Sequence, residues 1–376
     1  MQQVIVAYLL FAVFYLLIQW VFGKKWDKGL DVRVYCERDC AYEGDTLILV
    51  EEVANQKAML LPAVKVKFAT SKEWKFKEES SGITSDQYYR NDLFSIGMYE
   101  RIKRSFSFTC NKRGYYALGD VDVFVSSYFY SREYVMRKKQ QQSIYVFPKR
   151  VQAPVISMCV KQMLGQTLAK RKLYEDPFMF QGIRDYQNYD SMGKINWKSS
   201  AKTGELKVNC YAHTAEQEVK LLLYFDKINA EIDRTMEEYA ISLAATLAEC
   251  LLERHIVVAM VTNGLDIAND GSICVGAGAG SQHMRQIDEG LARIDLHKNL
   301  PFESEKSFFQ RELKGDKMYV VITTSRTVGV QKSLIEEAAK GSDLVWVVPH
   351  YAMDQLQVAS ELQDKVIEII ADEELG

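Results

Sequence analysis

Continuous apolar runs in the second half of the chain constrain its fold more than any other feature. A strand buried on both faces needs apolar side chains at every position, whereas a strand with one wet face alternates. The runs are separated by segments with the helical spacing of apolar residues, which predicts a doubly wound α/β sheet. The predicted strands are residues 220–225, 256–261, 318–323, 344–348 and 366–370, and the predicted helices are residues 231–254, 281–295, 303–313 and 328–340.

The segment from Asp31 to Arg150 has a different pattern. Short runs rich in Val, Ile, Phe and Tyr alternate apolar with polar residues, and turn residues separate them. This alternation predicts an antiparallel β-sandwich. Residues 113–125 are interpreted as a tight hairpin whose glycines serve turn geometry. The clearest predicted strands are residues 32–35, 46–50, 63–68 and 105–109.

The N-terminal segment is apolar. From Val4 to Phe22 no residue is charged, and Gln19 is the only strongly polar one. As a helix this run is about 28 Å long, close to the ~30 Å hydrocarbon core of a bilayer. No basic residue precedes it and no small-residue cleavage site follows, which disfavours a secretory signal. Lysines follow the run, so the positive-inside rule predicts a single-pass anchor in the cell membrane, at residues 1–23, with the bulk of the chain in the cytoplasm.

Composition argues against several classes of function. The chain has 376 residues, enough for two domains, and a formal net charge of −3, which provides no basic field for nucleic acid. Its seven cysteines lack C-x-x-C spacing and are predicted to be reduced thiols. The five histidines show no metal-ligand spacing, and no nucleophile with a base is evident. We therefore expect no enzymatic activity, no cofactor and no nucleic-acid partner.

Residues 182–206 combine glycine, arginine, aspartate and tryptophan at fixed offsets. Arg184 and Asp190 are predicted to form a charge-assisted pair, and Ile195 and Trp197 to share one face of an extended stretch. Two interpretations remain open: a structural clasp against the α/β domain, with buried aromatics and paired charges, or an exposed loop that meets an acidic partner. The basic residues of such a loop would be Arg184, Lys194, Lys198 and Lys202.

This signature segment resembles the most specific motif of domain-of-unknown-function family fifty-eight: G-x-R-x-Y, a Pro-Gly-Asp turn, then R-x-I-x-W-x-x-S-A-R. The chain departs from the motif at Asn188 and Tyr189, which replace Pro-Gly, and at Lys194 and Lys202, which replace arginine. Lysine cannot reproduce the bidentate guanidinium contact. The signature residues are Gly182, Arg184, Tyr186, Asp190, Ile195, Trp197, Lys198, Ser200 and Ala201.

The resemblance implies an architecture and a partner. It implies a membrane anchor (1–23), a β-sandwich (31–150), a connecting helix with the signature segment (151–212) and a von Willebrand factor A-like α/β domain (213–376). The connecting helix is predicted over residues 154–172. The resemblance further implies a protein partner, a MoxR-type AAA+ ATPase, in the maturation or assembly of envelope proteins.

Von Willebrand factor A-like domains raise the question of a magnesium site after the first strand, in the pattern Asp-x-Ser-x-Ser. Here the stretch is D-K-I-N-A: Asp226 keeps the carboxylate, but Ile228 and Ala230 offer no oxygen, so we predict no metal. Open α/β sheets bind ligands beyond the carboxyl ends of their strands, which predicts a partner-binding face there. Its residues would be Asp226, Asn229, Thr262, Asn263, Thr323 and Ser325.

The glycine-rich stretch at residues 276–280 lacks the spacing of a phosphate loop and is interpreted as a turn capped by Ser281. The favoured function is a membrane-anchored cytoplasmic adaptor. The alternatives are a metal-dependent hydrolase that uses Asp226, and an envelope-binding module that faces outward.

Overall fold

The computed structural model divides into two compact units, Met1–Lys149 (unit 1) and Arg150–Gly376 (unit 2), each with its own hydrophobic core. Most of the predicted connecting helix at residues 154–172 lies outside the described residues. The described residues are 2–77, 83–84, 88–151, 156, 160–161, 180–187, 190–211, 218–226, 234–269, 271–296, 305–315, 317–354 and 357–371.

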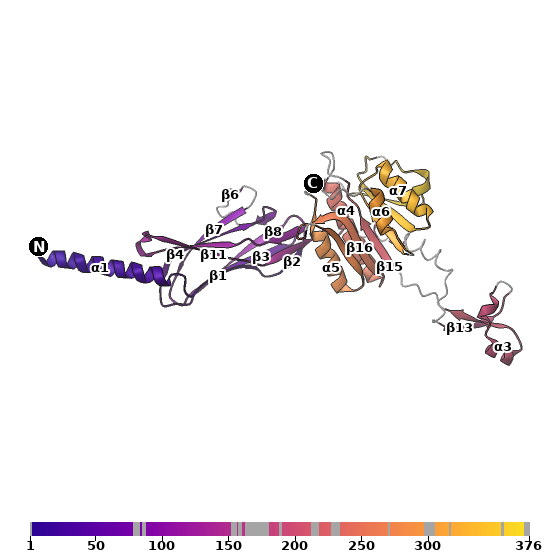
Figure 1. Cartoon of the computed structure of the whole chain (residues 1–376), viewed down its shortest axis with the longest axis horizontal. Coiled ribbons are helices and arrows are strands. Elements are labelled where there is room, and N and C mark those ends of the chain that lie inside the picture. The colour runs from indigo at the N-terminus through magenta and orange to yellow at the C-terminus, as the bar shows by residue number, and fades with distance from the viewer. Residues whose placement is uncertain are drawn as a thin grey trace. The chain divides into compact units, whose positions relative to one another are not determined.

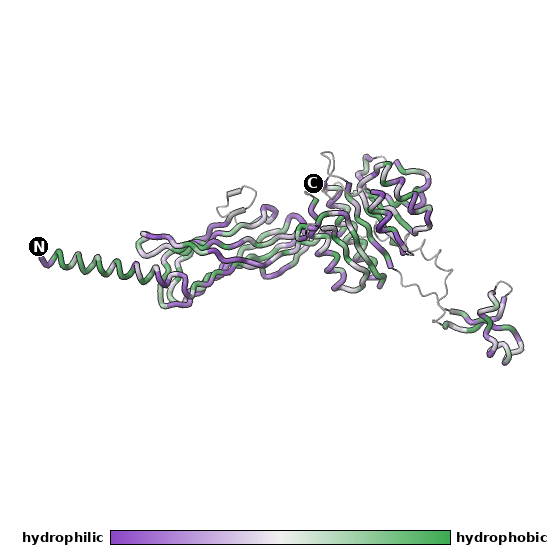
Figure 2. Tube along the Cα trace, in the orientation of Figure 1, coloured by the Kyte–Doolittle hydropathy of each residue, from purple (hydrophilic) through white to green (hydrophobic). Residues whose placement is uncertain are grey.

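The N-terminal apolar run forms α1 (Gln2–Lys25), most of which Figure 2 colours as hydrophobic. Its mean hydropathy over a membrane-length window is 2.4, and most of that window is exposed. The helix is therefore long and apolar enough to cross a membrane. Both a membrane anchor and a signal sequence have this length and composition.

The rest of unit 1 is a β-sandwich, as the alternating pattern predicts. One sheet has the strand order β1-β3-β8-β5, the other has the order β11-β10-β4-β7-β6, and a short sheet has the order β2-β12-β9. Apolar residues from all of them form one core. The strands are β1 (Leu30–Cys36), β2 (Cys40–Tyr42), β3 (Thr46–Asn55), β4 (Leu61–Thr70), β5 (Trp74–Phe76), β6 (Ile83–Thr84), β7 (Tyr88–Ile96), β8 (Arg101–Cys110), β9 (Gly114–Ala117), β10 (Val121–Ser126), β11 (Glu133–Lys138) and β12 (Ser143–Phe147).

Residues 113–125 do not form the predicted hairpin. β9 pairs with β12 in the short sheet, whereas β10 pairs with β4 and β11. The prediction was wrong because the glycine that looked like a turn residue serves packing instead. A Cβ atom at Gly114 would lie 2.9 Å from the Tyr116 ring, so glycine lets that ring lie over the strand.

Unit 2 contains a mixed α/β sheet with mostly parallel strands, in the order β17-β16-β15-β19-β20-β21. β16, β15, β19, β20 and β21 run parallel, and β17 and β18 pair antiparallel with β16. Alternate side chains of β15 enter two cores, since Leu221 faces the core that includes α4 and α5, while Leu222 faces the core that includes α6 and α7. Burial on both faces explains the continuous apolar runs.

The elements of this sheet and its helices, shown in Figure 1, follow the predicted order, except that β17 and β18 were not predicted. They are β15 (Glu218–Leu223), α4 (Arg234–Glu253), β16 (Val257–Asp266), β17 (Ser272–Gly278), α5 (Ser281–Ala292), β18 (Ile294–Asp295), α6 (Glu305–Glu312), β19 (Met318–Ile322), α7 (Val328–Ala339), β20 (Asp343–His350) and β21 (Val366–Ile370).

The glycine-rich stretch before α5 is also not a turn capped by Ser281. Gly276 and Gly278 belong to β17, and the N-cap of α5 is Gly280, with a φ of 86°. A Cβ atom at Gly278 would lie 2.5 Å from the ring of His283. Glycine thus makes room for His283, whose Nε2 lies 2.7 Å from the Val258 carbonyl oxygen.

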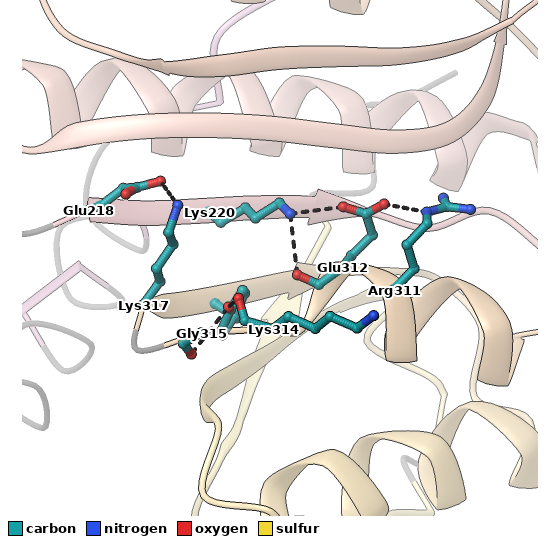
Figure 3. A network of polar contacts seen from close by, with 8 residues as sticks. Glu218, Lys220, Arg311, Glu312, Lys314, Gly315 and Lys317 are labelled. Atoms are coloured by element: carbon teal, nitrogen blue, oxygen red, sulfur yellow. Dashed lines mark hydrogen bonds and ion pairs between the residues drawn. The ribbon is translucent and has the colours of Figure 1, made fainter.

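A polar network ties α6 to β15 on the α6 side of the sheet (Figure 3). Lys220 Nζ donates to Glu312 Oε2 over 2.8 Å, and Arg311 Nε donates to Glu312 Oε1 over 2.6 Å. Lys317, just before β19, pairs with Glu218. Burial opposes ionisation of Glu312, but the hydrogen bonds from Lys220 and Arg311 outweigh it and hold its pKa below the ordinary value. The network stabilises the charged carboxylate.

Candidate functional site

The switch point of the parallel sheet lies between β15 and β19. These neighbouring strands are followed by α4 and α7, which pack into the cores on opposite faces of the sheet. Chain connections therefore diverge at the carboxyl ends of β15 and β19, which is where open α/β sheets bind ligands. Asp226 follows β15, and Thr323 and Ser325 follow β19, so the predicted face includes this point.

Asp226 and Ser325 are brought into contact there. The Ser325 hydroxyl donates to Asp226 Oδ2 and lies 3.3 Å from the Thr327 hydroxyl. The Ser325 backbone N–H donates to Thr323 Oγ1 over 3.0 Å. Thr323 and Ser325 are buried, and Asp226 is half-buried. The Asp226 carboxylate thus accepts from the Ser325 hydroxyl, and Thr323 and Thr327 contact Ser325 in turn.

Thr262 and Asn263 hold neighbouring backbone instead of extending this face. Asn263 Nδ2 donates to the Phe225 carbonyl over 2.8 Å, and the Phe225 N–H donates back to Asn263 Oδ1 over 2.8 Å. Thr262 Oγ1 accepts from the Gly264 N–H over 3.0 Å. Thr262 is fully buried, as is Thr323, because both side chains point into the packed layers beside the sheet. Their buried side chains support the site.

Asn229, the remaining residue of the predicted face, lies outside the described residues. The sequence prediction also missed three polar residues near the switch point. Thr327 caps α7 by accepting from the Val330 N–H. Arg326 donates to Asp354 Oδ2 over 2.6 Å, joining the start of α7 to the segment after β20. A threonine three residues before an apolar helical position is an N-cap signal that could have identified Thr327. No local pattern marks the Arg326–Asp354 pair.

The oxygen donors near Asp226 bear on metal binding. Within the described part of the chain, no group of three or more His, Cys, Asp or Glu side chains is placed to hold a metal ion. Hard divalent cations need a shell of about six oxygens, usually with more than one carboxylate. The absence of a metal stays a prediction, since residues 227–230 follow Asp226 outside the described residues.

The signature segment forms a small hairpin with a helix: β13 (Phe180–Asp185), η2 (Met192–Lys194), α3 (Trp197–Thr203) and β14 (Lys207–Tyr211). The predicted Arg184–Asp190 pair is confirmed as a bidentate contact, with both N–O distances 2.6 Å. Asp190 Oδ2 also accepts from the Gln187 N–H over 2.9 Å. The hydrogen bonds from Arg184 hold the pKa of Asp190 below its ordinary value.

Several signature residues are explained by hydrogen bonding within the segment. Asn196, which the sequence prediction missed, caps α3 by accepting from the Ser199 N–H over 2.9 Å. The Ser200 hydroxyl donates to the Asn196 carbonyl and accepts from the Lys207 N–H, each over 2.9 Å. Ile195 is buried and bridges to β14. This half of the motif is held together by its own hydrogen bonds.

Trp197 corrects the prediction of an extended stretch shared with Ile195. It begins α3, and its side chain is 67% exposed. A helix forms here because Asn196 caps its start and Gly204, with a φ of 75°, ends it in the left-handed conformation. Of the remaining signature residues, Gly182 and Tyr186 are half-buried, while Lys198 and Ala201 on α3 are exposed. The motif thus has one half held by internal hydrogen bonds and an exposed helical face.

Comparisons with known proteins add information on the sandwich only. No family model matches the sequence, and no curated protein matches it. A CARDB domain from Pyrococcus furiosus is similar to 32% of this chain over 90% of its own length, at 17% identity and a TM-score of 0.21. A cohesin module of a Clostridium perfringens family 33 glycoside hydrolase covers 31% of this chain over 96% of its length, at 9% identity and a TM-score of 0.22. The collagen-binding subdomain of the Enterococcus faecalis surface protein ACE covers 30% over 95%, at 9% identity and 0.21.

Proposed function

We propose that this protein is a membrane-anchored interaction protein, held in the bilayer by α1, that binds a protein partner at the switch point between β15 and β19. The observation that carries the proposal is the half-buried Asp226 carboxylate, which the Ser325 hydroxyl holds at the edge where open α/β sheets bind ligands. A fixed carboxylate suits a basic or N–H-donating group on a protein partner.

The partner in this proposal is a MoxR-type AAA+ ATPase that acts in the maturation or assembly of envelope proteins. Support comes from the resemblance of residues 182–206 to family fifty-eight, and from the doubly wound sheet that a von Willebrand factor A-like domain requires. The exposed face of α3, with Trp197, Lys198 and Lys202, provides a second contact surface for an acidic partner.

A pull-down tests the partner. The tagged full chain is recovered from detergent-solubilised membranes with and without ATP, and co-purified ATPase is quantified by mass spectrometry. We expect Asp226→Asn and Ser325→Ala to lower recovery several-fold. Asp364→Asn is the matched control, because this exposed aspartate precedes β21 and lies at the opposite edge of the sheet. Equal recovery with Asp226→Asn and the wild type, or no ATPase with either, contradicts the proposal.

Calorimetry separates this function from a metal-dependent hydrolase. Titration of the full chain with Mg²⁺ and with Mn²⁺ should give no saturable heat, because within the described residues no three His, Cys, Asp or Glu side chains are placed to hold a metal ion. Saturable heat that disappears in Asp226→Asn would favour the hydrolase instead.

Thiol labelling tests the cytoplasmic location. Cys274 on β17 is exposed and serves as the reporter, with Cys274→Ser as its control. A membrane-impermeant maleimide should label Cys274 only after intact cells are permeabilised. Labelling in intact cells would place unit 2 outside and would favour the envelope-binding module.

A further inference from the structure

Exposed aromatic and apolar side chains gather at one end of the β-sandwich. β4 starts with Leu61 opposite Ile96 of β7, and its Ala63 lies opposite Ser126 of β10, so the loops at residues 56–60, 97–100 and 127–132 share this end. The exposed fractions of their large apolar residues are 39% for Leu60, 60% for Met98, 71% for Tyr99, 69% for Phe129 and 71% for Tyr130.

Three of these aromatic residues have a strained backbone. The φ angles are 55° for Tyr99, 65° for Phe129 and 54° for Tyr130. Among the described residues, His255 is the only other non-glycine residue with a positive φ. The left-handed region costs a bulky residue about 1–2 kcal/mol. Two loops at the same end therefore accept strain while leaving aromatic rings uncovered, a combination that marks functional sites more than core packing.

The loop between β10 and β11 holds this conformation by its own hydrogen bonds. The Ser127 N–H donates to the Arg132 carbonyl over 2.8 Å, and the Tyr130 N–H donates to the Ser127 carbonyl over 2.9 Å. The buried Ser127 hydroxyl accepts from the Arg132 N–H over 3.0 Å. Phe129 and Tyr130 therefore project from a fixed turn.

The same loop runs along the apolar helix. Gln19 Nε2 donates to the Tyr128 carbonyl over 3.0 Å, and the rings of Phe22 and Tyr128 lie 5.1 Å apart. Further back along α1, the rings of Tyr15 and Phe129 lie 5.7 Å apart. Tyr15 and Phe22 are about 10 Å apart along a helix axis. The loop thus follows the last two turns of the apolar run that begins at Val4.

The sandwich is fitted to the helix beyond this point as well. A Cβ atom at Gly23 would lie 2.9 Å from the Tyr134 hydroxyl, so glycine permits the close approach of β11. The Tyr134 ring stacks on Trp26 with centroids 5.2 Å apart. Lys57 Nζ donates to the Lys25 carbonyl over 3.0 Å. These contacts fix the depth of the 127–132 loop along α1.

We propose that this end of the β-sandwich enters the boundary between lipid headgroups and acyl chains, with Phe129 and Tyr130 as a wedge beside α1. The inference rests on the proposed anchoring by α1. A loop that contacts Tyr15 and Gln19 lies within about 10 Å of the membrane level that Phe22 occupies.

Two further observations favour lipid as the occupant. Amphipathic aromatic rings prefer the membrane interface. Rings that no protein atoms cover are removed from water there, so they carry no penalty for exposed apolar surface. Gln19 is the one strongly polar side chain of the run, and it is buried with its amide bonded to the loop. In hydrocarbon the Nε2 donor would lack a partner, so the loop satisfies that donor at membrane depth, while the buried Oε1 has no partner within the described residues.

Quenching by brominated lipids tests the wedge. Phe129→Trp in the full chain is reconstituted in nanodiscs whose acyl chains carry bromine, and the wild-type signal is subtracted to isolate the added tryptophan. Tyr42→Trp is the matched control, because Tyr42 is exposed on β2, and Figure 1 draws β2 at the end of the sandwich away from α1. We expect several-fold stronger quenching and a bluer emission for Phe129→Trp. Quenching equal to that of Tyr42→Trp would overturn the proposal.

Trp20 separates failure of the wedge from failure of the anchor. This tryptophan is exposed on α1, and its contribution is the signal lost in Trp20→Phe. If bromine quenches Trp20 but not the tryptophan introduced by Phe129→Trp, the anchor stands and the wedge is refuted. An unquenched Trp20 refutes both. Tyr130→Trp, at an equally exposed position, repeats the test if Phe129→Trp fails to fold.

Discussion

Each unit contains a carboxylate that is shielded from water, but the two carboxylates differ in their hydrogen bonds and in the direction of their pKa shifts. Glu51 on β3 is fully buried, and neither of its oxygens has a hydrogen-bond partner within the described residues. Glu312 at the end of α6 accepts hydrogen bonds from Lys220 and Arg311. Burial, reinforced by the charge of Asp92, raises the pKa of Glu51 to about 8. In contrast, the pKa of Glu312 lies below its ordinary value.

The difference arises because no nearby arginine donates a hydrogen bond to Glu51: Arg90 Nη1 is buried without a partner within the described residues, and the other donors of Arg90 and Arg104 point elsewhere. Arg90 Nε donates to Asp92 Oδ2 over 3.3 Å, and its guanidinium lies 3.7 Å from the centre of the Phe106 ring. Arg104 donates to a backbone carbonyl of β7 over 3.1 Å. Proximity to a cation is therefore not enough to stabilise an interior carboxylate. A direct hydrogen bond decides whether burial favours the charged or the neutral form.

The largest effect is expected from Glu51→Gln. The unfolded carboxyl ionises near 4.5 and the folded one near 8, so the folded state binds the extra proton between these values. The free energy of unfolding of unit 1 should therefore fall by about 3 kcal/mol as pH rises from ~5 to ~8, and Glu51→Gln should abolish that fall. Urea unfolding at a series of pH values measures this free energy. Unfolded protein is counted by a brief labelling pulse on the buried Cys110 thiol, and the pulse is given at the same pH for every sample.

Glu52→Gln is the matched control, since Glu52 is the next residue on β3 and pairs with Arg101 and Lys103 at 3.3 Å. This variant should keep the fall with pH. If Glu51→Gln retains the full pH dependence, Glu51 does not cause it. The proposed difference between an unpartnered Glu51 and a hydrogen-bonded Glu312 is then wrong.

A smaller effect is expected from Lys220→Met in unit 2. The substitution leaves the half-buried Glu312 without its interior cation, which should cost about 2 kcal/mol. Faster hydrogen exchange in peptides from β15 and α6 reports the loss. Lys317→Met removes the more exposed pair with Glu218 and should change exchange less. Equal effects of the two substitutions would show that burial does not set the strength of these pairs.

Acid should destabilise unit 2 through Glu312, whereas base should destabilise unit 1 through Glu51. The depressed pKa of Glu312 contributes stability above its ordinary value of 4.5, and this contribution is lost as pH falls through the folded pKa. Below pH 5, exchange at β15 and α6 should accelerate in the wild type relative to Glu312→Gln. Unit 1 has no such loss from Glu51, because that carboxyl is already protonated there.

The smallest effect is expected from Arg184→Lys in the signature hairpin. Lysine cannot form both hydrogen bonds to Asp190, so β13 should lose some protection from exchange, while unit 1 is unaffected. Lys198→Arg, on the exposed face of α3, should leave exchange unchanged. Full protection in Arg184→Lys would mean that one of the two contacts suffices.

Local patterns predicted four strands of the sandwich and most helices and parallel strands of unit 2, because burial on one or two faces requires a particular spacing of apolar residues. The pair between Arg184 and Asp190 was also predicted, since complementary charges six residues apart can meet within one hairpin. Predictions failed where a single residue changed the local conformation. Asn196 turned an expected strand into α3, and packing against Tyr116 gave Gly114 a role other than a turn.

The candidate partner face was predicted only in outline. Sheet topology placed Asp226 and Ser325 at the carboxyl edge, but their contact joins residues 99 positions apart. The aromatic end of the sandwich had no sequence signal, because Gln19 and Tyr128 are 109 positions apart and the φ of Phe129 follows from the turn it occupies.

The sequence by itself determined the apolar helix, the alternating sandwich and the mostly parallel sheet, because each follows from the periodicity of apolar residues along a short stretch. Only the tertiary structure decided which polar groups find partners. Glu51 and Glu312 are the same residue type, yet one ionises above its ordinary pKa and the other below it. The physical reason is that desolvation and hydrogen bonding depend on side chains brought together from distant positions, which no local pattern contains.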